Sequence, residues 1–138
     1  MERIIIIGGK GAAVVLADQI IHAVQNYNAK YELLGYAIDD ESLGDNINGF
    51  PILAKIKELH EKYAKYSDVK YFFALYKPSC MKERVDLFKS LNLPHEKFIN
   101  FVHPSPFVAP SAKLGIGNVV RSNVTINSNA PIRNFTPL

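Results

Sequence analysis

The sequence predicts an α/β protein in two parts: a parallel β-sheet with alternating helices over residues 1–100, and the first coils of a parallel β-helix over residues 101–138. Three observations lead to this prediction. Ile4–Ile7 is a β-branched run that ends in glycines, which is typical of a strand buried on both faces. Apolar residues then follow helix and strand spacing in turn as far as Leu91. From Val102 onward a six-residue repeat replaces both.

The first part consists of three strand–helix pairs. The predicted elements, in order, are a strand at 4–7, a helix at 12–24, a strand at 32–40, turn residues at 45–51, a helix at 52–63, a strand at 71–75 and a helix at 81–91. Strands that alternate with helices of this length form a parallel sheet with right-handed crossovers. The first part is therefore expected to be a Rossmann-like β-α-β-α-β-α domain.

The second part is defined by its strict period. Aliphatic residues recur every six positions, at Val102, Val108, Leu114, Val120, Ile126, Ile132 and Leu138. Neither a helix nor an ordinary strand has this period, whereas equivalent residues of a left-handed β-helix stack in its interior at this spacing. A coil buries its interior only by stacking on the next coil. We therefore expect the last ten or so residues to be frayed, exchanged with another chain or packed back on the first part.

Composition narrows the function classes. The 138 residues are 48% hydrophobic, enough for one core with a small appendage, and the net charge is only +3. The lysines are spread along the chain, so no basic patch for nucleic acid is expected, and no apolar run is long enough to span a membrane. Cys80 is the single cysteine, which indicates a reducing compartment and hence the cytoplasm. No group of ligands at metal-binding spacing surrounds His103, so no metal is expected.

A glycine loop, Gly8-Gly9-Lys10-Gly11, joins the first strand to the first helix. Backbone N–H groups in such a loop approach phosphate oxygens closely, and the positive end of the helix dipole favours the anion. Lys10 would add a point charge beside a pyrophosphate. The alternative is a tight turn without a ligand, with Lys10 as a solvated surface lysine. We favour ligand binding, because loops at this place bind ligands in sheets of this type.

Two acids and an arginine are further candidates. Asp39 and Asp40 close the second predicted strand, where an acid accepts a ribose hydroxyl in dinucleotide folds. The alternative is a turn or helix cap at this point. Arg84 lies early in the third predicted helix, where it would bind a phosphate through two hydrogen bonds. The alternative interpretation is that Arg84 is an exposed arginine on the helix surface without a ligand.

Taken together, the two parts resemble the bacterial sialic acid O-acetyltransferase and UDP-bacillosamine N-acetyltransferase family of hexapeptide-repeat acyltransferases. The resemblance covers essentially the whole chain and rests on residues 4–11, 34–40, 49–52, 102–105 and 108–115. It implies that the Rossmann-like part holds a UDP-linked amino sugar, with the acids at the nucleoside end. It further implies that the β-helix forms a homotrimer and binds acetyl-CoA between neighbouring subunits for transfer to the sugar.

The resemblance also implies which parts of the enzyme are missing. In the family, the catalytic histidine and the CoA-binding coils come later in the β-helix than the end of this sequence. The chain is therefore expected to be truncated and not to acetylate by itself. Histidine is the usual general base for such a transfer. His103, however, falls at the family's entry to the β-helix, and we interpret it as structural. Two other functions stay open: a stand-alone nucleotide-binding regulatory or interaction module, and a nicotinamide-dependent oxidoreductase domain, which the incomplete glycine pattern disfavours.

Overall fold

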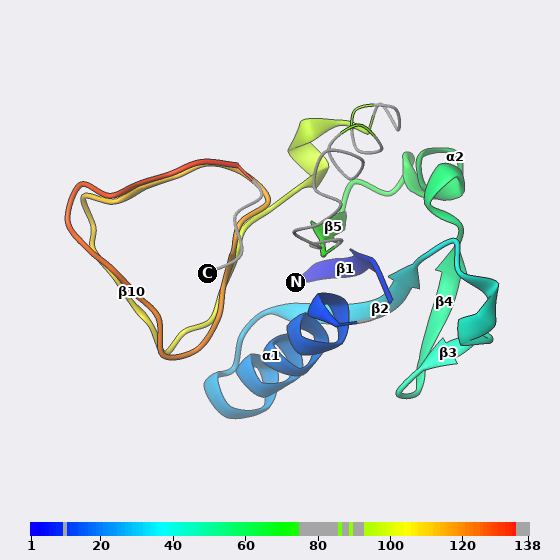
Figure 1. Cartoon of the computed structure of the whole chain (residues 1–138), viewed down its shortest axis with the longest axis horizontal. Coiled ribbons are helices and arrows are strands. Elements are labelled where there is room, and N and C mark those ends of the chain that lie inside the picture. Colours follow the sequence, from blue (N-terminus) through cyan, green and yellow to red (C-terminus); the bar gives the residue numbers. More distant parts are fainter. Residues whose placement is uncertain (10, 75–85, 87–88, 90–92, 135–138) are drawn as a thin grey trace.

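The computed structural model describes residues 1–9, 11–74, 86, 89 and 93–134, and it confirms the predicted fold class. A mainly parallel sheet lies beside a triangular coil (Figure 1). The elements before the coil are β1 (Glu2–Ile7), α1 (Ala12–Tyr27), β2 (Tyr31–Ala37), η1 (Glu41–Leu43), β3 (Asn46–Ile47), β4 (Phe50–Ala54), η2 (Ile56–Glu58), α2 (Leu59–Tyr63) and β5 (Val69–Phe73). The strand order is β3-β4-β2-β1-β5, and every pair is parallel except the β3–β4 hairpin.

The sheet is buried on both faces, as the isoleucine run predicted. All four isoleucines of β1 are 0% exposed. Because side chains alternate along a strand, Ile4 and Ile6 pack with α1, whereas Ile5 and Ile7 pack with Leu59 of α2 on the other face. Burial on both faces explains why β1 reads as continuous β-branched sequence rather than as an alternating strand.

Two strands were missed, and one predicted helix begins later than expected. The residues predicted to be turn and helix from 45 to 55 form the β3–β4 hairpin, and β4 adds a parallel strand beside β2. Asn48 and Gly49 both have positive φ (50° and 88°), which is the backbone of a tight hairpin turn. Ile52 therefore pairs with Tyr36 in the sheet instead of starting a helix. The helical segment begins at Ile56, where the backbone N–H receives a side-chain cap.

The predicted third helix, 81–91, lies outside the described residues apart from Asp86 and Lys89, which are helical.

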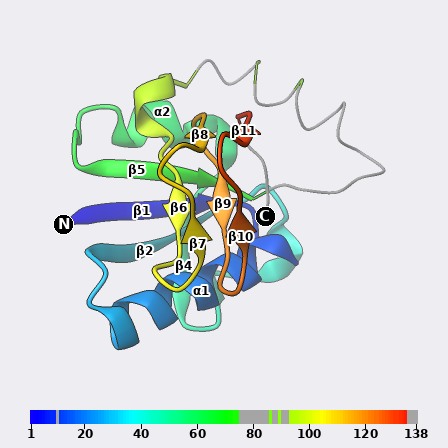
Figure 2. The same cartoon turned by 90° about the vertical axis from the view of Figure 1, so that its left-hand side faces the viewer.

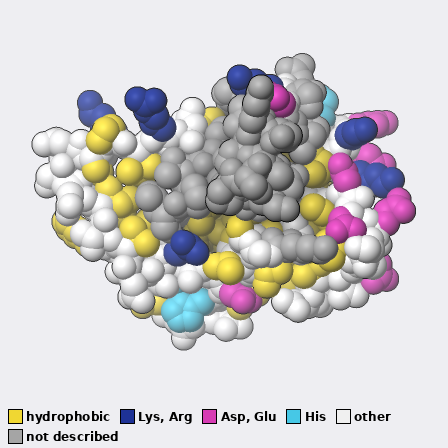
Figure 3. Space-filling view, in the orientation of Figure 1, with side chains coloured by type: hydrophobic (Ala, Val, Ile, Leu, Met, Phe, Trp, Pro, Cys, Tyr) yellow, Lys and Arg dark blue, Asp and Glu magenta, His cyan; other side chains and the backbone are white. Residues whose placement is uncertain are grey.

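The coil has the predicted period. After η4 (His95–Lys97) come β6 (Phe101–Val102), β7 (Phe107–Val108), β8 (Lys113–Leu114), β9 (Val119–Val120), β10 (Thr125–Ile126) and β11 (Pro131–Ile132). The aliphatic residues stack in parallel pairs three repeats apart: Val102 on Val120, Val108 on Ile126 and Leu114 on Ile132. Figure 2 shows the two coils side by side, and Figure 3 shows hydrophobic side chains inside the triangle of Figure 1.

The expectation for the end of the chain is wrong as far as Asn134. We expected the last ten or so residues to leave the coil, but β11 stays in register on β8. The backbone N–H of Ile116 also donates to Oδ1 of Asn134 at 2.9 Å, one coil away. The pairing of β11 with β8 and this side-chain bond together give hydrogen-bond partners to backbone groups where the two coils meet near Ile116.

The coil and the sheet share one hydrophobic core. Phe101 and Val119 of the coil belong to the same buried cluster as Ile4, Ile6 and α1. Phe98, just before the coil, forms a parallel bridge to Tyr71 beside β5. The coil therefore packs directly against the sheet.

Candidate functional site

The candidate residues that the structure describes gather at the carboxyl edge of the sheet. Since β1, β2, β4 and β5 are parallel, the loops that follow them lie at one edge. From β1 the chain continues to β2 and β4 on one side of β1, and then crosses to β5 on the other side. Sheets of this kind bind ligands at the point where the strand order reverses, which here lies at β1. The N–H of Gly8 donates to the carbonyl of Ala37 at 2.9 Å, so the glycine loop lies directly beside the loop of Asp39 and Asp40. Lys10 and Arg84 lie outside the described residues.

The glycines of the loop have different surroundings. A Cβ on Gly8 would lie 3.0 Å from the carbonyl oxygen of Ala74, and one on Gly9 would lie 2.9 Å from Cδ1 of Leu43. Gly8 also has φ 137°, so the backbone itself favours glycine there, whereas a side chain at Gly9 would need Leu43 to shift. Gly11 differs, because no atom of the described residues lies within 4 Å of its Cβ position. As far as these residues show, the space at Gly11, where α1 begins, is open to a ligand.

The start of α1 provides uncapped backbone donors. Gly11 is the N-cap residue with φ 52° and ψ −111°, a conformation that only glycine adopts easily. Gly11 has no side chain to cap this end, and the first turn contains no acidic residue. Within the described part of the chain, the amide groups of the first turn and the positive end of the helix dipole are thus left for an external acceptor or for water.

Both acids cap short 3-10 helices: Asp40 the next one along the chain, and Asp39 the one that begins 17 residues later. Oδ1 of Asp39 accepts from the backbone N–H of Ile56 at 2.9 Å and so fixes the start of η2. Oδ1 of Asp40 accepts from the backbone N–H of Ser42 at 3.0 Å at the start of η1. Both side chains are exposed. The capping geometry of the alternative interpretation is present, and one oxygen of each carboxylate is occupied by the bond described here.

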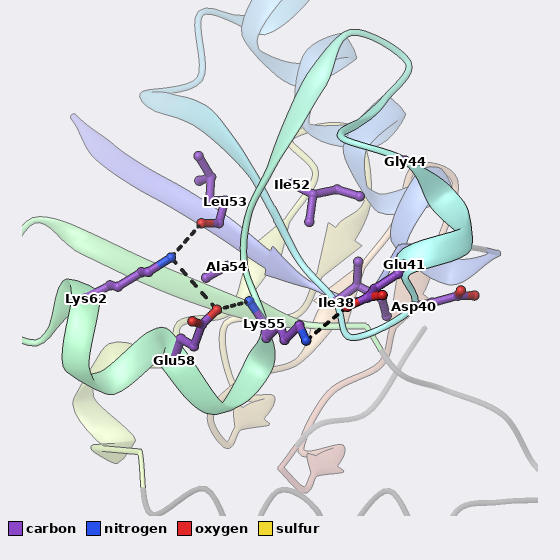
Figure 4. A pocket seen from close by; sticks show the side chains of 10 residues that line it. All are labelled: Ile38, Asp40, Glu41, Gly44, Ile52, Leu53, Ala54, Lys55, Glu58 and Lys62. Carbon is purple, nitrogen blue, oxygen red and sulfur yellow. Dashed lines mark hydrogen bonds and ion pairs between the residues drawn. The ribbon is translucent and has the colours of Figure 1, made fainter.

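A cavity of about 230 Å³ adjoins these acids, between η1, β4 and α2 (Figure 4). Ile38, Ile52 and Ala54 form part of its wall. Its charged rim is formed by Asp40 with two ion pairs, Lys55–Glu41 at 3.1 Å and Lys62–Glu58 at 3.8 Å. Figure 3 shows acidic and basic side chains intermingled at the end of the molecule where α2 and β4 lie.

The charged rim was not predicted from the sequence. The hydrogen bond from Lys55 to Glu41 raises the pKa of the lysine, with a smaller contribution from the charge of Glu58. Lys55 follows β4. This strand was not predicted, because the spacing of apolar residues from Ile52 onward indicated a helix. Asn-Gly at 48–49, flanked by Ile47 and Phe50, is the sequence signal for this hairpin.

A histidine pair joins α1 to the coil. Nδ1 of His22 lies 2.9 Å from Nε2 of His103, and the His103 ring is only 1% exposed. Nδ1 of His103 accepts from the backbone N–H of Ser105 at 3.1 Å. Burial, and secondarily the charge of His22, lower the pKa of His103. Both ring nitrogens of His103 are therefore engaged inside the protein.

The described residues contain neither a membrane-spanning helix nor a metal-binding cluster. No helix in this part of the chain is long and apolar enough to cross a bilayer. No three His, Cys, Asp or Glu side chains among residues 1–9, 11–74, 86, 89 and 93–134 lie close enough together to hold a metal ion. That the protein uses no metal stays a prediction.

Comparison with known proteins supports the fold. No protein-family model matches the sequence, and no curated protein matches it significantly. Among solved structures, the acetyltransferase domain of PglB from Neisseria gonorrhoeae has a TM-score of 0.73 at 20% identity, over 99% of this chain and 62% of that one. The same domain in complex with acetyl coenzyme A has a TM-score of 0.73 at 19% identity, over 99% and 60%.

A second neighbour is a histidine-to-asparagine mutant of perosamine N-acetyltransferase from Caulobacter crescentus, in complex with CoA and GDP-perosamine. Its TM-score is 0.68 at 21% identity, over 99% of this chain and 60% of that one. This chain has the fold of sugar N-acetyltransferases. It spans about 60% of the length of these neighbours.

Proposed function

We propose that the chain is the nucleotide-sugar-binding portion of a sugar O- or N-acetyltransferase that uses acetyl-CoA. The observation that carries the proposal is the likeness, over 99% of the chain, to an enzyme whose structure contains both CoA and GDP-perosamine. The likeness extends across the sheet and the coil together. A module that only binds nucleotides would account for the sheet but would not account for the coil.

The proposed ligand lies along the carboxyl edge of the sheet. Its pyrophosphate sits at the uncapped start of α1 beside Gly11, with Lys10 and Arg84 as cationic partners. Its nucleoside lies toward Asp39 and Asp40, whose exposed carboxylates accept the ribose hydroxyls. Gly8 and Gly9 shape the loop so that these groups lie side by side.

The ligand class is a nucleoside diphosphate linked to an amino sugar. The family resemblance implies a UDP-linked sugar, whereas the perosamine enzyme was crystallised with a GDP-linked one. The cavity beside Asp40, about 230 Å³ with apolar walls, has room for a base of either kind.

The family resemblance implies that acetyl transfer uses a histidine and CoA-binding coils that this sequence does not contain. When bound, acetyl-CoA supplies the acyl thioester that the sugar amine or hydroxyl attacks. His103 is a poor general base, because Ser105 and His22 occupy both of its ring nitrogens. We therefore propose that the chain binds a nucleotide sugar without acetylating it, and that the longer protein acts as a cytoplasmic homotrimer, as the resemblance implies.

Calorimetric titration tests the binding proposal. The ligands are UDP, GDP, their N-acetyl amino sugar conjugates, acetyl-CoA and NADH. We expect a nucleotide sugar to bind and Asp40→Asn to weaken it about tenfold, because a charge-assisted hydrogen bond to ribose is lost. The amide oxygen still caps Ser42, so the melting temperature of this variant should stay near that of the wild type.

Asp68→Asn is the matched control. Asp68 is an exposed acid whose partner is Arg3 at 3.3 Å, and both lie at the amino edge of the sheet. Its substitution should leave nucleotide-sugar affinity unchanged. Binding of acetyl-CoA alone, or an equal loss in both variants, would contradict the proposed site. Binding of NADH alone would favour an oxidoreductase domain.

A further inference from the structure

The hydrogen bond between His22 and His103 lies where α1 meets the coil. These histidines are 81 positions apart in the sequence, and their rings are nearly parallel, with centroids 5.1 Å apart. Tyr27, at the end of α1, packs edge-on against His103 at 5.2 Å. One turn earlier on α1, Gln19 binds Ser122 twice, accepting from its backbone N–H at 2.9 Å and donating to its hydroxyl at 3.2 Å. Two polar residue pairs, Gln19–Ser122 and His22–His103, thus connect α1 to the coil.

The hydrogen-bond network assigns the protons of the pair. The backbone N–H of Ser105 can only donate, so Nδ1 of His103 must carry a lone pair. Neutral His103 then carries its proton on Nε2 and donates it to Nδ1 of His22. His22 in turn carries its proton on Nε2. Both nitrogens that accept hydrogen bonds are therefore the nitrogens that would take a second proton.

A proton added to either ring removes an acceptor. On Nδ1 of His22 it would face the N–H of His103. On Nδ1 of His103 it would displace the N–H of Ser105, and the Ser105 hydroxyl at 2.9 Å would be its acceptor. Two donors directed at each other lose the hydrogen bond and leave a charge at a buried contact. The closed arrangement of α1 on the coil therefore favours a neutral His103, whose ring is 1% exposed.

The surroundings of the pair offer limited compensation for a positive charge. On α1, Asp18 lies one turn before His22 and is exposed, and Tyr27 contacts both rings. On the coil, Arg121 precedes Ser122 and is itself a cation. On the sheet side, Tyr31 of β2 packs on Phe101, which in turn contacts His103. An exposed carboxylate is screened by solvent, so it offsets little of the cost of charging the buried ring.

We propose that this histidine pair is a proton-sensitive latch, through which mild acidification releases the coil from the helix that begins at the glycine loop. Gly11 and His22 lie 11 residues apart on one rigid helix, about 16 Å at 1.5 Å per residue. The latch therefore couples the placement of the coil to the loop at the other end of α1. This coupling holds whichever ligand the loop takes.

The sign of the pH dependence follows from linkage. Burial lowers the pKa of His103 in the closed state, whereas a released ring titrates near its ordinary value of about 6.5. The released state thus binds more protons between these two values. The latch is fully closed above about pH 6.5 and weakens as the pH falls toward the pKa of the closed state, with up to a tenfold rise in the opening constant per pH unit.

Native-state hydrogen exchange of the Ser122 amide reports on the latch, because that N–H donates to Gln19 across the same contact. We expect its protection factor in the wild-type chain to fall as the pH is lowered from 7.5 to 5.5, by up to tenfold per unit below about 6.5. His103→Asn keeps an acceptor for Ser105 but does not titrate. It should show lower protection that no longer varies with pH. His60→Asn removes an exposed histidine of α2 and should behave as the wild type.

Three results would overturn the latch. One is a Ser122 protection factor that does not vary with pH in the wild type, and another is a pH dependence that survives in His103→Asn. The third is equal protection of the Ser122 and Ile6 amides, because the coil would then leave α1 only when the whole protein unfolds. If His103→Asn does not fold, ring nitrogen-15 spectra of the wild type decide the question. We expect both rings to be protonated on Nε2 alone at pH 7.5, and a proton on Nδ1 of either ring would refute the assignment.

Discussion

Replacing Phe101 by alanine tests whether the coil and the sheet form one folding unit. Phe101 opens the first strand of the coil, yet it is 0% exposed and belongs to the core of the sheet. Its ring centroid lies 5.7 Å from that of Phe72 on β5 and 5.8 Å from that of Tyr31 on β2. Truncation would therefore open a cavity at the joint between the two parts.

The expected loss follows from the area that the ring buries. A fully buried phenylalanine hides about 200 Å², worth about 5 kcal/mol at 25 cal/mol per Å², and alanine keeps a small share of this. We predict that Phe101→Ala lowers the free energy of unfolding by about 3–5 kcal/mol. Phe107 lies six residues later in the coil and is 58% exposed. The same reasoning gives less than about 2 kcal/mol for Phe107→Ala.

Urea denaturation followed by circular dichroism and by tyrosine fluorescence measures both variants. We expect one transition, coincident in the two signals, with a lower midpoint for Phe101→Ala. A loss below about 1 kcal/mol, or an equal loss in Phe107→Ala, would refute the shared core. So would two separate transitions of which only one shifts.

Three further substitutions have expected outcomes in the same assay. Gly35→Ala should cost more than about 2 kcal/mol or prevent folding, because its Cβ would collide with the carbonyl oxygen of Pro51 on β4; near-wild-type stability would contradict the β2–β4 pairing. Asp39→Ala should cost about 1 kcal/mol through loss of the Ile56 cap, whereas Asp39→Asn should cost much less, and equal losses would exclude the cap. Lys97→Met should cost about 2 kcal/mol, because the buried ammonium donates to three backbone carbonyls at 2.8–3.3 Å; no loss would show that these carbonyls find other donors.

The sequence predicted the fold where a single pattern dominates. Ile4–Ile7 is buried on both faces, so its composition alone specified a central parallel strand. Val102, Val108 and Leu114 each stack on a residue three repeats later, so the period alone predicted the coil. In both cases the local pattern and the tertiary packing impose the same constraint.

Prediction failed where tertiary contacts outweigh local spacing. Ile52 has helical spacing to Ile56, yet it pairs with Tyr36 at the open edge of β2. The Asn-Gly turn at 48–49 pairs β4 with β3 and so keeps this segment extended. Strand β4 in turn places Lys55 at the candidate site, so the charged rim of the cavity could not be predicted without it.

The candidate site was predicted in position but not in detail. The glycine loop and the acids of β2 come together because parallel strands bring their following loops to one edge. The tight packing of Gly9 against Leu43 depends on η1, a short turn with no sequence period. The pairing of His22 with His103 joins distant segments, which a single sequence does not reveal.

Amide nuclear magnetic resonance spectra recorded during a titration with UDP and with GDP test the central claim most directly. If a nucleoside diphosphate binds at the carboxyl edge of the sheet, the largest shifts will occur at Gly9, Gly11 and Asp40, where the loops after β1 and β2 meet. Shifts confined to coil residues such as Val108 and Ile126, or no shifts at millimolar nucleotide, would contradict it.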